Sequence, residues 1–526
     1  MKNIITSISS FEELIKADAI YVDKTDIIYS LIEKGPGMFF CSRPRRFGKT
    51  LTLSTFEAIF KGKKELFKGL KIYDKDYDWN EYPVIHIDLG KCQKKNAPEL
   101  ASWFNTSIIN IALDNGIELR ERDGYDINFD LLIQKMSKKG KLVILIDEYD
   151  KILSSNIYNP DVEEMRDVLR GFFEVIKASS ALVRFVFITG VTKFSKVSIF
   201  SSMNNLSDIS LSDDYSLLFG YTELELEHYF GQYIEKGMRA LGVSRKRYLE
   251  RVKRKYDGNR FTPRQREAIY NPVSIGSFFF NGGIDFDNYW INTGATKLIM
   301  DVARHIGFDI SKDITTPISK SDIAAFDILE MASNTVSAYA YKSLLFQCGY
   351  LTIRSMNRRG DIFVLDFPNE EVAEAYSENL LAAYTGKNTE SLFKGSDLKS
   401  SFDDGDTIEA IEKLRAVYAS IAYDLLRDAG EAHYSTAFFC MMKALGARIG
   451  SEIETSRGRI DAVLENRRHV YIFEFKYNKT ASEALKQIVE TKYYEPYMAS
   501  KKKIHLVGMN FSSSDRNINE WKEEIM

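Results

Sequence analysis

The segment that most constrains this chain spans residues 42–50 and reads SRPRRFGKT. It approaches the pattern G-x-x-x-x-G-K-[ST], in which the backbone N–H groups of a tight loop surround phosphates. Gly48, Lys49 and Thr50 occupy required positions, whereas Arg43 replaces the first glycine. Residues other than glycine disfavour positive φ, so we expect a phosphate-binding loop that follows a modified path.

The flanks of this loop support the same interpretation. Residues 37–41 are a short apolar run after a Gly-Pro-Gly turn, and residues 51–60 place apolar side chains at helical spacing. A strand, a tight loop and a helix N-terminus together form an anion-binding site. The alternative is a basic surface turn. The loop residues that we expect to contact a nucleotide are Arg43, Arg45, Arg46, Gly48, Lys49 and Thr50.

A second segment, KLVILIDEYD at residues 141–150, is a continuous apolar run that ends in acidic residues. Such a run is typical of a central strand buried on both faces. We expect Asp147 to hold Mg²⁺ together with the Thr50 hydroxyl, as in P-loop NTPases. Glu148 would then orient or deprotonate an attacking water. Strands that end in Asp-Glu are common, but the combination with the loop predicts an ATP site.

A third apolar strand at residues 182–190 ends in Thr189-Gly190. Thr189 is a candidate contact to the γ-phosphate, and Lys193, just beyond the strand, is a second candidate. A Thr-Gly pair at the end of a strand is also ordinary turn chemistry. Both interpretations stay open at this point.

A different pair of strands is predicted at residues 458–464 and 469–476, joined by the turn Glu-Asn-Arg-Arg. In a hairpin that closes at the two arginines, Asp461 lies opposite Glu474. Facing Cβ atoms are about 5 Å apart, and like charges at that distance destabilise a sheet. A cation between the two carboxylates would remove that repulsion. Lys476 lies two residues on, hence on the same face as Glu474.

Two carboxylates that hold Mg²⁺ or Mn²⁺, with an adjacent lysine, are typical of metal-assisted phosphodiester hydrolysis. Lys476 would position the attacking water or stabilise the charge that develops on the phosphate. The alternative is a surface hairpin with alternating charge. The apolar neighbours in both strands, and the helix expected after them, favour a nuclease-like site at Asp461, Glu474 and Lys476.

The motifs of the chain resemble those of the bacterial AAA-ATPase-like family, which commonly carries a C-terminal nuclease-like domain of the PD-(D/E)XK superfamily. The resemblance covers nearly the whole chain. It rests on residues 21–25, 43–50, 147–151, 189–194, 198–201 and 204–208, and on the D…ExK pattern of Asp461, Glu474 and Lys476. It implies ATP binding, and it implies that arginine at position 43 is usual in the family.

The resemblance also implies roles for side chains around the hairpin. Glu431 resembles the upstream acid of PD-(D/E)XK nucleases and would be a further metal ligand, and Glu454 is another acidic candidate. Gln487, on a helix expected at residues 482–497, resembles a glutamine that some members use.

The order of the predicted elements indicates an α/β protein with several parts. Strands alternate with helices through about residue 220, which favours a parallel P-loop sheet. Residues 341–367 predict a helix followed by two strands, which resembles a winged helix. Its turn arginines would reach DNA phosphates, although packing as a structural lever is the preferred alternative. The expected boundaries are 1–220 for the ATPase core, 221–290 for a helical lid by analogy with other ATPases, 291–385 for the winged-helix-like domain, 386–428 for a linker and helix, and 429–526 for a restriction-endonuclease-like α/β domain.

Length and composition narrow the class of protein. The chain has 526 residues and a net charge of −3. That length predicts about two to four domains, and the near-neutral charge means that nucleic acid, most simply DNA, would bind through local patches. Four scattered cysteines argue against a disulfide framework and agree with a cytoplasmic location. Neither a signal peptide nor a membrane span is expected.

The sequence therefore predicts an ATP-binding and ATP-hydrolysing protein whose nucleotide cycle gates a metal-dependent nuclease acting on DNA or RNA. The alternative is an ATP-dependent switch or scaffold whose C-terminal domain binds nucleic acid or protein without cleavage. A DNA-translocating motor is disfavoured, because we find no helicase-like motif and no clear arginine finger. Assembly into a homo-oligomer is compatible with either function.

Overall fold

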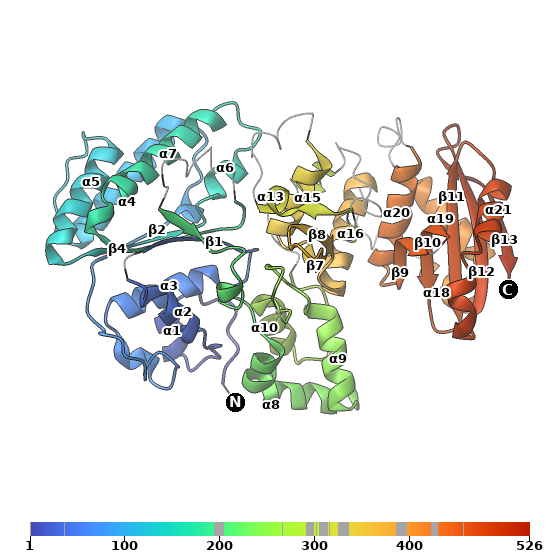
Figure 1. Cartoon of the computed structure of the whole chain (residues 1–526), viewed down its shortest axis with the longest axis horizontal. Coiled ribbons are helices and arrows are strands. Elements are labelled where there is room, and N and C mark those ends of the chain that lie inside the picture. The colour runs from blue at the N-terminus through green and yellow to red at the C-terminus, as the bar shows by residue number, and fades with distance from the viewer. Residues whose placement is uncertain are drawn as a thin grey trace. The chain divides into compact units, whose positions relative to one another are not determined.

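The chain divides into two compact units. A computed structural model describes residues 2–526 except 36, 194–202, 204, 266, 291–298, 301, 304–313, 315, 325–335, 386–396, 422–429 and 456. The first unit comprises Met1–Trp290 with Ile318–Phe363, and the second comprises Ile291–Pro317 with Val364–Met526. Their elements are labelled in Figure 1.

A five-stranded sheet with the order β2-β3-β4-β1-β5 forms the centre of the first unit, and its paired strands are all parallel. The strands are β1 (Gly37–Ser42), β2 (Val84–Asp88), β3 (Leu142–Asp147), β4 (Val183–Gly190) and β5 (Leu206–Asp208). Every residue of β3 is buried, as its continuous apolar sequence predicts for a central strand. The parallel α/β sheet expected from the sequence is therefore confirmed.

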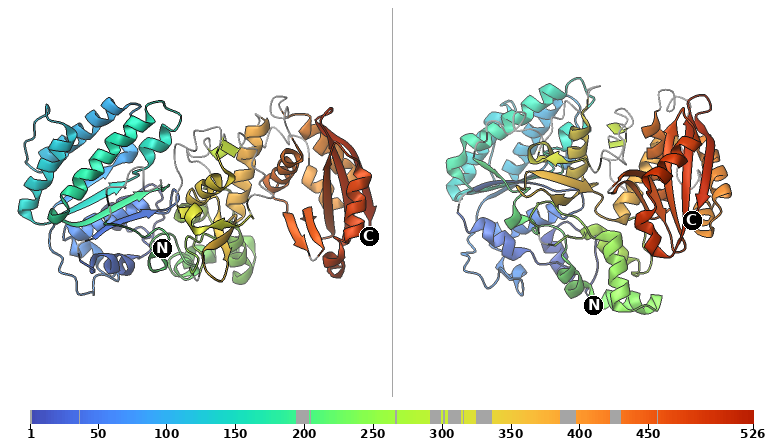
Figure 2. Two further views of the ribbon diagram at one scale, coloured as in Figure 1. Left: turned by 45° about the horizontal axis from the view of Figure 1, so that its top comes forward. Right: turned by 45° about the vertical axis from the view of Figure 1, so that its right-hand side comes forward.

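Helices cover both faces of this sheet (Figure 1 and Figure 2). One face carries α1 (Phe11–Lys16), α2 (Thr25–Ile32) and α3 (Lys49–Phe60), and the other carries α4 (Ala97–Asp114), α5 (Tyr125–Met136) and α7 (Val162–Ala178), with the short α6 (Lys151–Ser155) after β3. Phe56 of α3 contacts Phe185 and Phe187 of β4, with ring centroids 5.1 and 4.9 Å apart. Packing on β4 thus fixes the helix that follows the phosphate-binding loop.

Three helices follow the sheet in the region for which the sequence predicts a lid. They are α8 (Glu223–Leu241), α9 (Arg245–Tyr256) and α10 (Pro272–Phe280). Thr222 and Glu225 form a capping box at the start of α8, and Asn271 caps α10 with Pro272 in its first turn. These are the start signals that the sequence carries. Short 3-10 helices are η1 (Lys64–Phe67), η2 (Leu89–Lys91), η3 (Ser137–Lys139), η4 (Ser180–Leu182), η5 (Asp213–Tyr215) and, in the second unit, η7 (Glu495–Ser500).

The predicted helix and two strands of the middle region are present. The elements are β6 (Ile318–Ser319), α13 (Lys320–Ala324), α15 (Ala338–Gln347), β7 (Thr352–Met356) and β8 (Ile362–Asp366), and the strands form a sheet with the order β6-β8-β7. Asn357 organises the turn between β7 and β8, since its Oδ1 accepts hydrogen bonds from the backbone N–H groups of Gly360 and Asp361.

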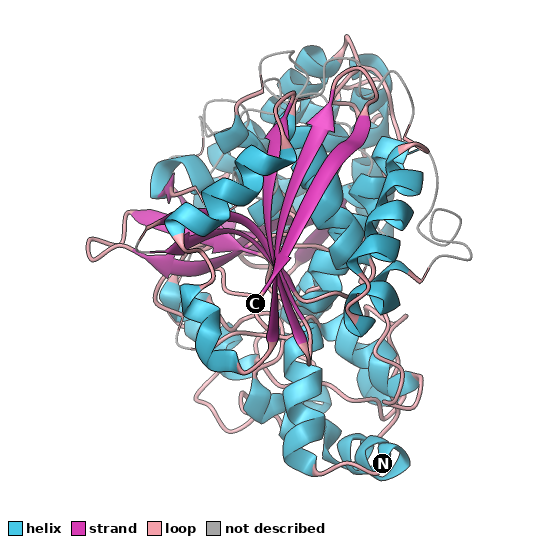
Figure 3. Ribbon diagram, turned by 90° about the vertical axis from the view of Figure 1, so that its right-hand side faces the viewer, coloured by secondary structure: helices cyan, strands magenta, loops and turns pink. Residues whose placement is uncertain are grey.

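The second unit is built on a mixed sheet with the order β13-β12-β11-β10-β9, in which β11 and β12 are parallel and the other pairs antiparallel. Figure 3 shows the twist of these strands. The elements are α16 (Glu370–Thr385), α18 (Leu398–Asp404), α19 (Thr407–Tyr418), α20 (Glu431–Ala444), β9 (Ile449–Thr455), β10 (Gly458–Glu465), β11 (His469–Tyr477), α21 (Ala481–Thr491), β12 (Lys503–Ser512) and β13 (Asn517–Ile525).

The polar composition of residues 386–406 predicts a linker, and the observed structure differs there. The described part of the predicted linker contains α18, whose Leu398 and Phe402 are buried. Phe402 contacts Tyr471 of β11 at 5.1 Å between ring centroids, and the Tyr471 hydroxyl donates to the Phe402 carbonyl over 2.8 Å. Two apolar anchors thus outweigh the polar composition on which the linker prediction relied. Among the described helices, none combines the length and apolar character needed to cross a membrane.

Candidate functional site

The loop between β1 and α3 has the form of an anion-binding turn. Gly48 precedes the first residue of α3 with a φ of 91°, a conformation that favours glycine. Arg46 also has a positive φ, 67°, but Arg43 does not. Glycine is therefore unnecessary at the position where the common pattern requires it, and the modified path expected from the sequence is observed.

The Arg43 side chain is directed into the protein. It is 2% exposed, and its Nη1 donates to the backbone carbonyls of Ser42 and Ser210 over 2.8 and 2.7 Å. Its guanidinium lies 4.6 Å from the ring centroid of Phe261. The sequence led us to expect this guanidinium beside polyphosphate, and these contacts correct that expectation. The guanidinium instead joins the end of β1 to the chain that follows β5.

Lys49 lies at the centre of the loop. Its Nζ donates to the carbonyls of Arg43 and Pro44 over 2.9 and 3.0 Å, and burial lowers the pKa of this ammonium. Arg45 is half-buried, and its charge acts on Lys49 and Glu148. Arg46 donates to the carbonyl of Tyr289 over 3.4 Å. The three arginines thus have three different environments.

Three predicted site residues from three elements form one hydrogen-bonded set. The Thr50 hydroxyl donates to Asp147 Oδ2 over 2.6 Å, and the Thr189 hydroxyl donates to Asp147 Oδ1. The Glu148 backbone N–H donates to the same Oδ1 over 2.9 Å. A carboxylate beside a hydroxyl supplies the hard oxygen ligands that Mg²⁺ prefers, so these residues fit a nucleotide-associated magnesium ion.

Glu148 has an unusual backbone and an altered acidity. Its φ is 51°, which is uncommon for a residue other than glycine and is found at functional sites. Burial raises the pKa of its carboxyl, with the neighbouring charge of Asp147 adding to the effect. A carboxyl with a raised pKa is better suited to accept a proton from water near neutral pH.

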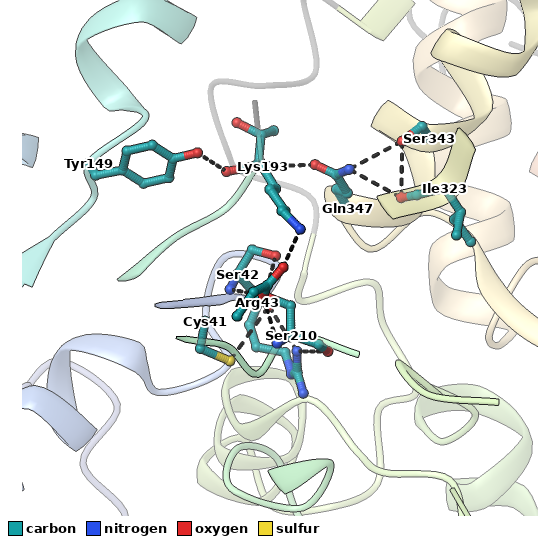
Figure 4. Close-up of polar contacts among 11 residues, drawn as sticks. Cys41, Ser42, Arg43, Tyr149, Lys193, Ser210, Ile323, Ser343 and Gln347 are labelled. Atoms are coloured by element: carbon teal, nitrogen blue, oxygen red, sulfur yellow. Dashed lines mark hydrogen bonds and ion pairs between the residues drawn. The ribbon is translucent and has the colours of Figure 1, made fainter. Parts of the chain in front are cut away.

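Sequence reasoning missed the residues that hold the end of β4. Asp150 accepts hydrogen bonds from the backbone N–H groups of Val191 and Thr192 and from the Thr192 hydroxyl, over 3.1, 2.8 and 2.6 Å. Lys193 forms an ion pair with Asp208 and donates its backbone N–H to Gln347 Oε1 over 2.6 Å (Figure 4). Asp150 is the last residue of the Asp-Glu-Tyr-Asp run at 147–150, so its role could have been predicted from the sequence. No local sequence pattern points to Gln347.

Some segments of the family resemblance lie outside the described residues. These are Phe194, residues 198–201 and Asn204.

The second predicted site lies on the β10–β11 hairpin. Ala462 pairs with Phe473 and Glu465 with Val470, so Asp461 and Glu474 occupy the next facing positions, and the predicted register is confirmed. Asp461 Oδ2 accepts from the Phe475 backbone N–H over 2.7 Å. The Lys476 ammonium donates to Glu474 Oε1 over 2.7 Å.

Both carboxyl groups of this hairpin have raised pKa values. Burial, followed by the charge of Asp461, raises the pKa of Glu474 to about 8, and burial raises the pKa of Asp461 to about 6. Glu474 is 2% exposed, and its Oε2 is buried without a hydrogen-bond partner among the described residues. A buried carboxylate oxygen without a partner, beside a second carboxyl, fits a divalent cation.

The other residues expected at this site are less closely placed. Glu431 begins α20 and is exposed, and its charge contributes to the raised pKa values of Asp461 and Glu474. Within the described ranges, no three His, Cys, Asp or Glu side chains are grouped closely enough to hold a metal ion. Gln487 is half-buried on α21.

The fold and these sites define the class of protein. The first unit has a P-loop ATPase sheet, and the second has the mixed sheet of the PD-(D/E)XK fold. Residues 6–200 match the family described as predicted AAA-ATPase, and residues 429–521 match the PD-(D/E)XK nuclease superfamily. The chain is also similar to the "Uncharacterized protein in vnfD 5'region" of Azotobacter chroococcum mcd 1, with 33% identity over 529 residues and 98% of each chain covered. The chain therefore belongs to the AAA-ATPase-like family with a C-terminal PD-(D/E)XK nuclease-superfamily domain.

Two solved structures are more distantly similar. The Aeropyrum pernix ORC1 protein in complex with DNA has 12% identity and a TM-score of 0.25, with 68% of this chain and 93% of that chain covered. The Aeropyrum pernix ORC2 protein (ADPNP-ADP complexes) has 12% identity and a TM-score of 0.17, with 71% and 93% covered. TM-scores this low do not establish a shared fold.

Proposed function

We propose that this protein binds and hydrolyses ATP in its first unit, and that the nucleotide cycle gates a metal-dependent nuclease in its second unit. DNA is the proposed substrate, with RNA as the other nucleic acid to be tested. The observation that carries the proposal is the presence of two separate sets of catalytic groups. One is the Thr50–Asp147–Thr189 hydrogen-bonded set, and the other is the Asp461–Glu474 carboxyl pair with Lys476.

In the ATPase site, a bound Mg²⁺ would neutralise charge on the β- and γ-phosphates. Thr50 and Asp147 are its proposed ligands. Lys49 would move its ammonium from the loop carbonyls to the terminal phosphates. Glu148 would orient a water and accept its proton, which its raised pKa favours. Thr189 would report the γ-phosphate through its hydrogen bond to Asp147.

In the nuclease site, a bound Mg²⁺ or Mn²⁺ would polarise the phosphodiester and lower the pKa of a water. Asp461 and the unpartnered Oε2 of Glu474 would hold it, with Glu431 as the proposed third acid. Lys476 would leave Glu474 to orient the water or to stabilise the negative charge of the transition state. Gln487 is proposed to contact the nucleic acid rather than the ion.

Purified full-length protein tests the nuclease assignment. With Mn²⁺ or Mg²⁺ and ATP, we expect cleavage of at least one of single-stranded DNA, double-stranded DNA and RNA, and we expect Asp461→Ala to abolish it. Glu490→Ala is the matched control, because Glu490 is an exposed carboxylate of α21 that pairs with Lys486 alone among the described residues. Cleavage by Asp461→Ala at the wild-type rate would reject the proposed site.

The alternative function is a nucleotide-dependent switch or scaffold whose second unit binds nucleic acid without cutting. Two observations favour it: the lack of a third close metal ligand among the described residues and the ion pair that already engages Glu474 Oε1. Calorimetric titration with Mn²⁺ separates the two functions. A nuclease site binds Mn²⁺ through Asp461 and Glu474. In a module that only binds nucleic acid, these two carboxyl groups do not bind the ion.

The middle region and the cellular setting complete the proposal. We propose that α15 with the β7–β8 hairpin acts as a winged-helix-like lever, and that its exposed turn residues Arg358 and Arg359 are the second place to test for DNA contact. The four cysteines are free and buried, which supports a cytoplasmic location. Homo-oligomer formation is testable by light scattering with and without ATP.

A further inference from the structure

We propose that Gln347 is a positioning residue for ATP hydrolysis, and that it couples the nucleotide site to α15 and the β7–β8 hairpin. This inference rests on the ATPase function proposed above. Gln347 ends α15, more than 150 residues after the nearest predicted ATPase residue in the sequence, and it lies outside every motif of the nucleotide site. Its contacts within the first unit carry the argument.

The Gln347 amide is fixed at both ends. The residue is 6% exposed. Its Oε1 accepts from the backbone N–H of Lys193 over 2.6 Å, and its Nε2 donates to Ser343 Oγ and to the Ile323 carbonyl over 3.1 and 3.3 Å. Figure 4 shows the amide between Lys193 on one side and Ser343 and Ile323 on the other. Because acceptors surround its nitrogen and a donor meets its oxygen, the amide has one satisfactory orientation.

From Lys193, the peptide bond to Thr192 and a series of hydrogen bonds lead back to the predicted magnesium ligand. Thr192 is held by the Asp150 carboxylate, and its carbonyl accepts from the Tyr149 hydroxyl over 3.0 Å (Figure 4). The Tyr149 backbone N–H donates to the Thr189 carbonyl over 3.0 Å, and the Thr189 hydroxyl donates to Asp147. Since these buried groups have specific partners, a movement of Asp147 when nucleotide binds cannot be absorbed locally. The movement of Asp147 displaces residues 189–193, and Gln347 transmits this displacement to α15.

A second contact between α15 and the nucleotide site is independent of that series. Gly349 has a φ of 87°, and a Cβ added there would lie 2.7 Å from Cβ and Cγ of Pro44. Pro44 belongs to the phosphate-binding loop. The end of α15 and the turn that follows it therefore contact the loop at Pro44 and the chain after β4 at Lys193.

Arg43, which stands where the common loop pattern has its first glycine, belongs to the same network. Lys193 forms an ion pair with Asp208, and Asp208 Oδ1 accepts from the backbone N–H of Ser210 over 2.9 Å. The Ser210 carbonyl in turn accepts from Arg43. Arg43, at the base of the loop, is thus joined through Lys193 to Gln347, which gives this arginine a role in coupling instead of in phosphate contact.

A near-isosteric variant tests the role of Gln347. Gln347→Met keeps the volume and removes the hydrogen bonds. We expect kcat for ATP hydrolysis to fall about tenfold, the effect expected for the lost hydrogen bond to Lys193. KM for ATP should stay unchanged within about twofold, because Gln347 is not among the proposed nucleotide contacts. Gln347→Glu keeps an acceptor for Lys193 and should recover part of kcat. Asn128→Leu is the matched control, because this buried amide of α5 bonds to Asn105 and Arg120, away from the site.

Hydrogen exchange of the wild-type protein supplies a measurement that requires no variant. A non-hydrolysable ATP analogue should change the exchange of residues 338–356, and Gln347→Met should lose that change while still binding the analogue. If wild type binds the analogue but exchange in this region does not respond, or if Gln347→Met retains both kcat and the response, the coupling is wrong and the ATPase function stands. If wild type binds no nucleotide, the proposed function fails and the coupling fails with it.

Discussion

The proposed nucleotide site and the proposed nuclease site are built in opposite ways. Around Asp147, each carboxylate oxygen already accepts a hydrogen bond from a residue of the site. On the β10–β11 hairpin, Glu474 keeps one buried oxygen without a partner among the described residues, and its neighbour Asp461 raises its pKa further. The first site is preformed by satisfied polar groups, whereas the second retains an electrostatic cost that a cation would relieve. This difference predicts how each site responds to mutation.

The largest expected effect is at the nucleotide site. Lys49→Ala removes the ammonium that the loop carbonyls hold in place and should reduce ATP hydrolysis by about 1,000-fold, because this charge stabilises the transferring phosphate. A phosphate-release assay measures the effect. Lys61→Ala is the control, since Lys61 follows α3 and forms only an exposed ion pair with Glu57 in the described structure. An equal loss of ATP hydrolysis in Lys49→Ala and Lys61→Ala would mean that Lys49 has no specific role in catalysis.

A smaller effect is expected for metal binding at the nuclease site. Glu474→Gln keeps the shape of the side chain and removes the charge, so the affinity for Mn²⁺ should fall about 100-fold. The rate of ATP hydrolysis, measured without nucleic acid, should stay within about twofold of wild type. Calorimetry gives the affinity, with Glu490→Gln as the control. An unchanged affinity would mean that the unpartnered oxygen is not a ligand.

Replacement of Arg43 tests whether the departure from the common loop pattern is structural. Arg43→Gly restores the usual glycine but removes two hydrogen bonds and the contact with Phe261. We expect the free energy of unfolding to fall by about 2–4 kcal/mol, and the nucleotide affinity of the folded protein to change less than about threefold. Chemical denaturation and a fluorescent nucleotide measure the two quantities. Intact stability with much weaker nucleotide binding would instead assign Arg43 to phosphate contact.

The smallest expected effect is the pH dependence of stability without metal. The pKa of Glu474, about 8 in the folded protein, lies above its value in an unfolded chain. The folded state therefore holds a proton that the unfolded state releases, and stability should fall as pH rises from about 5 to 8. In EDTA, the melting temperature should drop by several degrees across this range. Glu474→Gln should leave the slope below about pH 6, where Asp461 titrates, and flatten it between about pH 6 and 8. A slope between about pH 6 and 8 that persists in this variant would place the responsible group elsewhere.

Local patterns predicted much of both sites. The apolar runs before Ser42 and Asp147 specify buried strands, and the facing positions of Asp461 and Glu474 follow from the position of the hairpin turn alone. These features depend on residues close in sequence, where periodicity and turn chemistry determine the structure.

Other features depend on contacts between distant residues. The direction of the Arg43 side chain is set by Ser210 and Phe261, and the position of Lys193 is set by Gln347. Such pairs leave no local pattern in one sequence. The helix α18 was missed for a related reason, because its few apolar residues find partners on β11 only in the folded unit.

The central claim is that the nucleotide cycle of the first unit gates cleavage by the second. Its most direct test is the rate of DNA cleavage in Mn²⁺ with ATP, with a non-hydrolysable analogue and without nucleotide, for wild type and for Lys49→Ala. We predict that the wild-type rate changes with the nucleotide supplied, and that Lys49→Ala cleaves at one rate under all three conditions. A wild-type rate that is the same with and without ATP would contradict the claim.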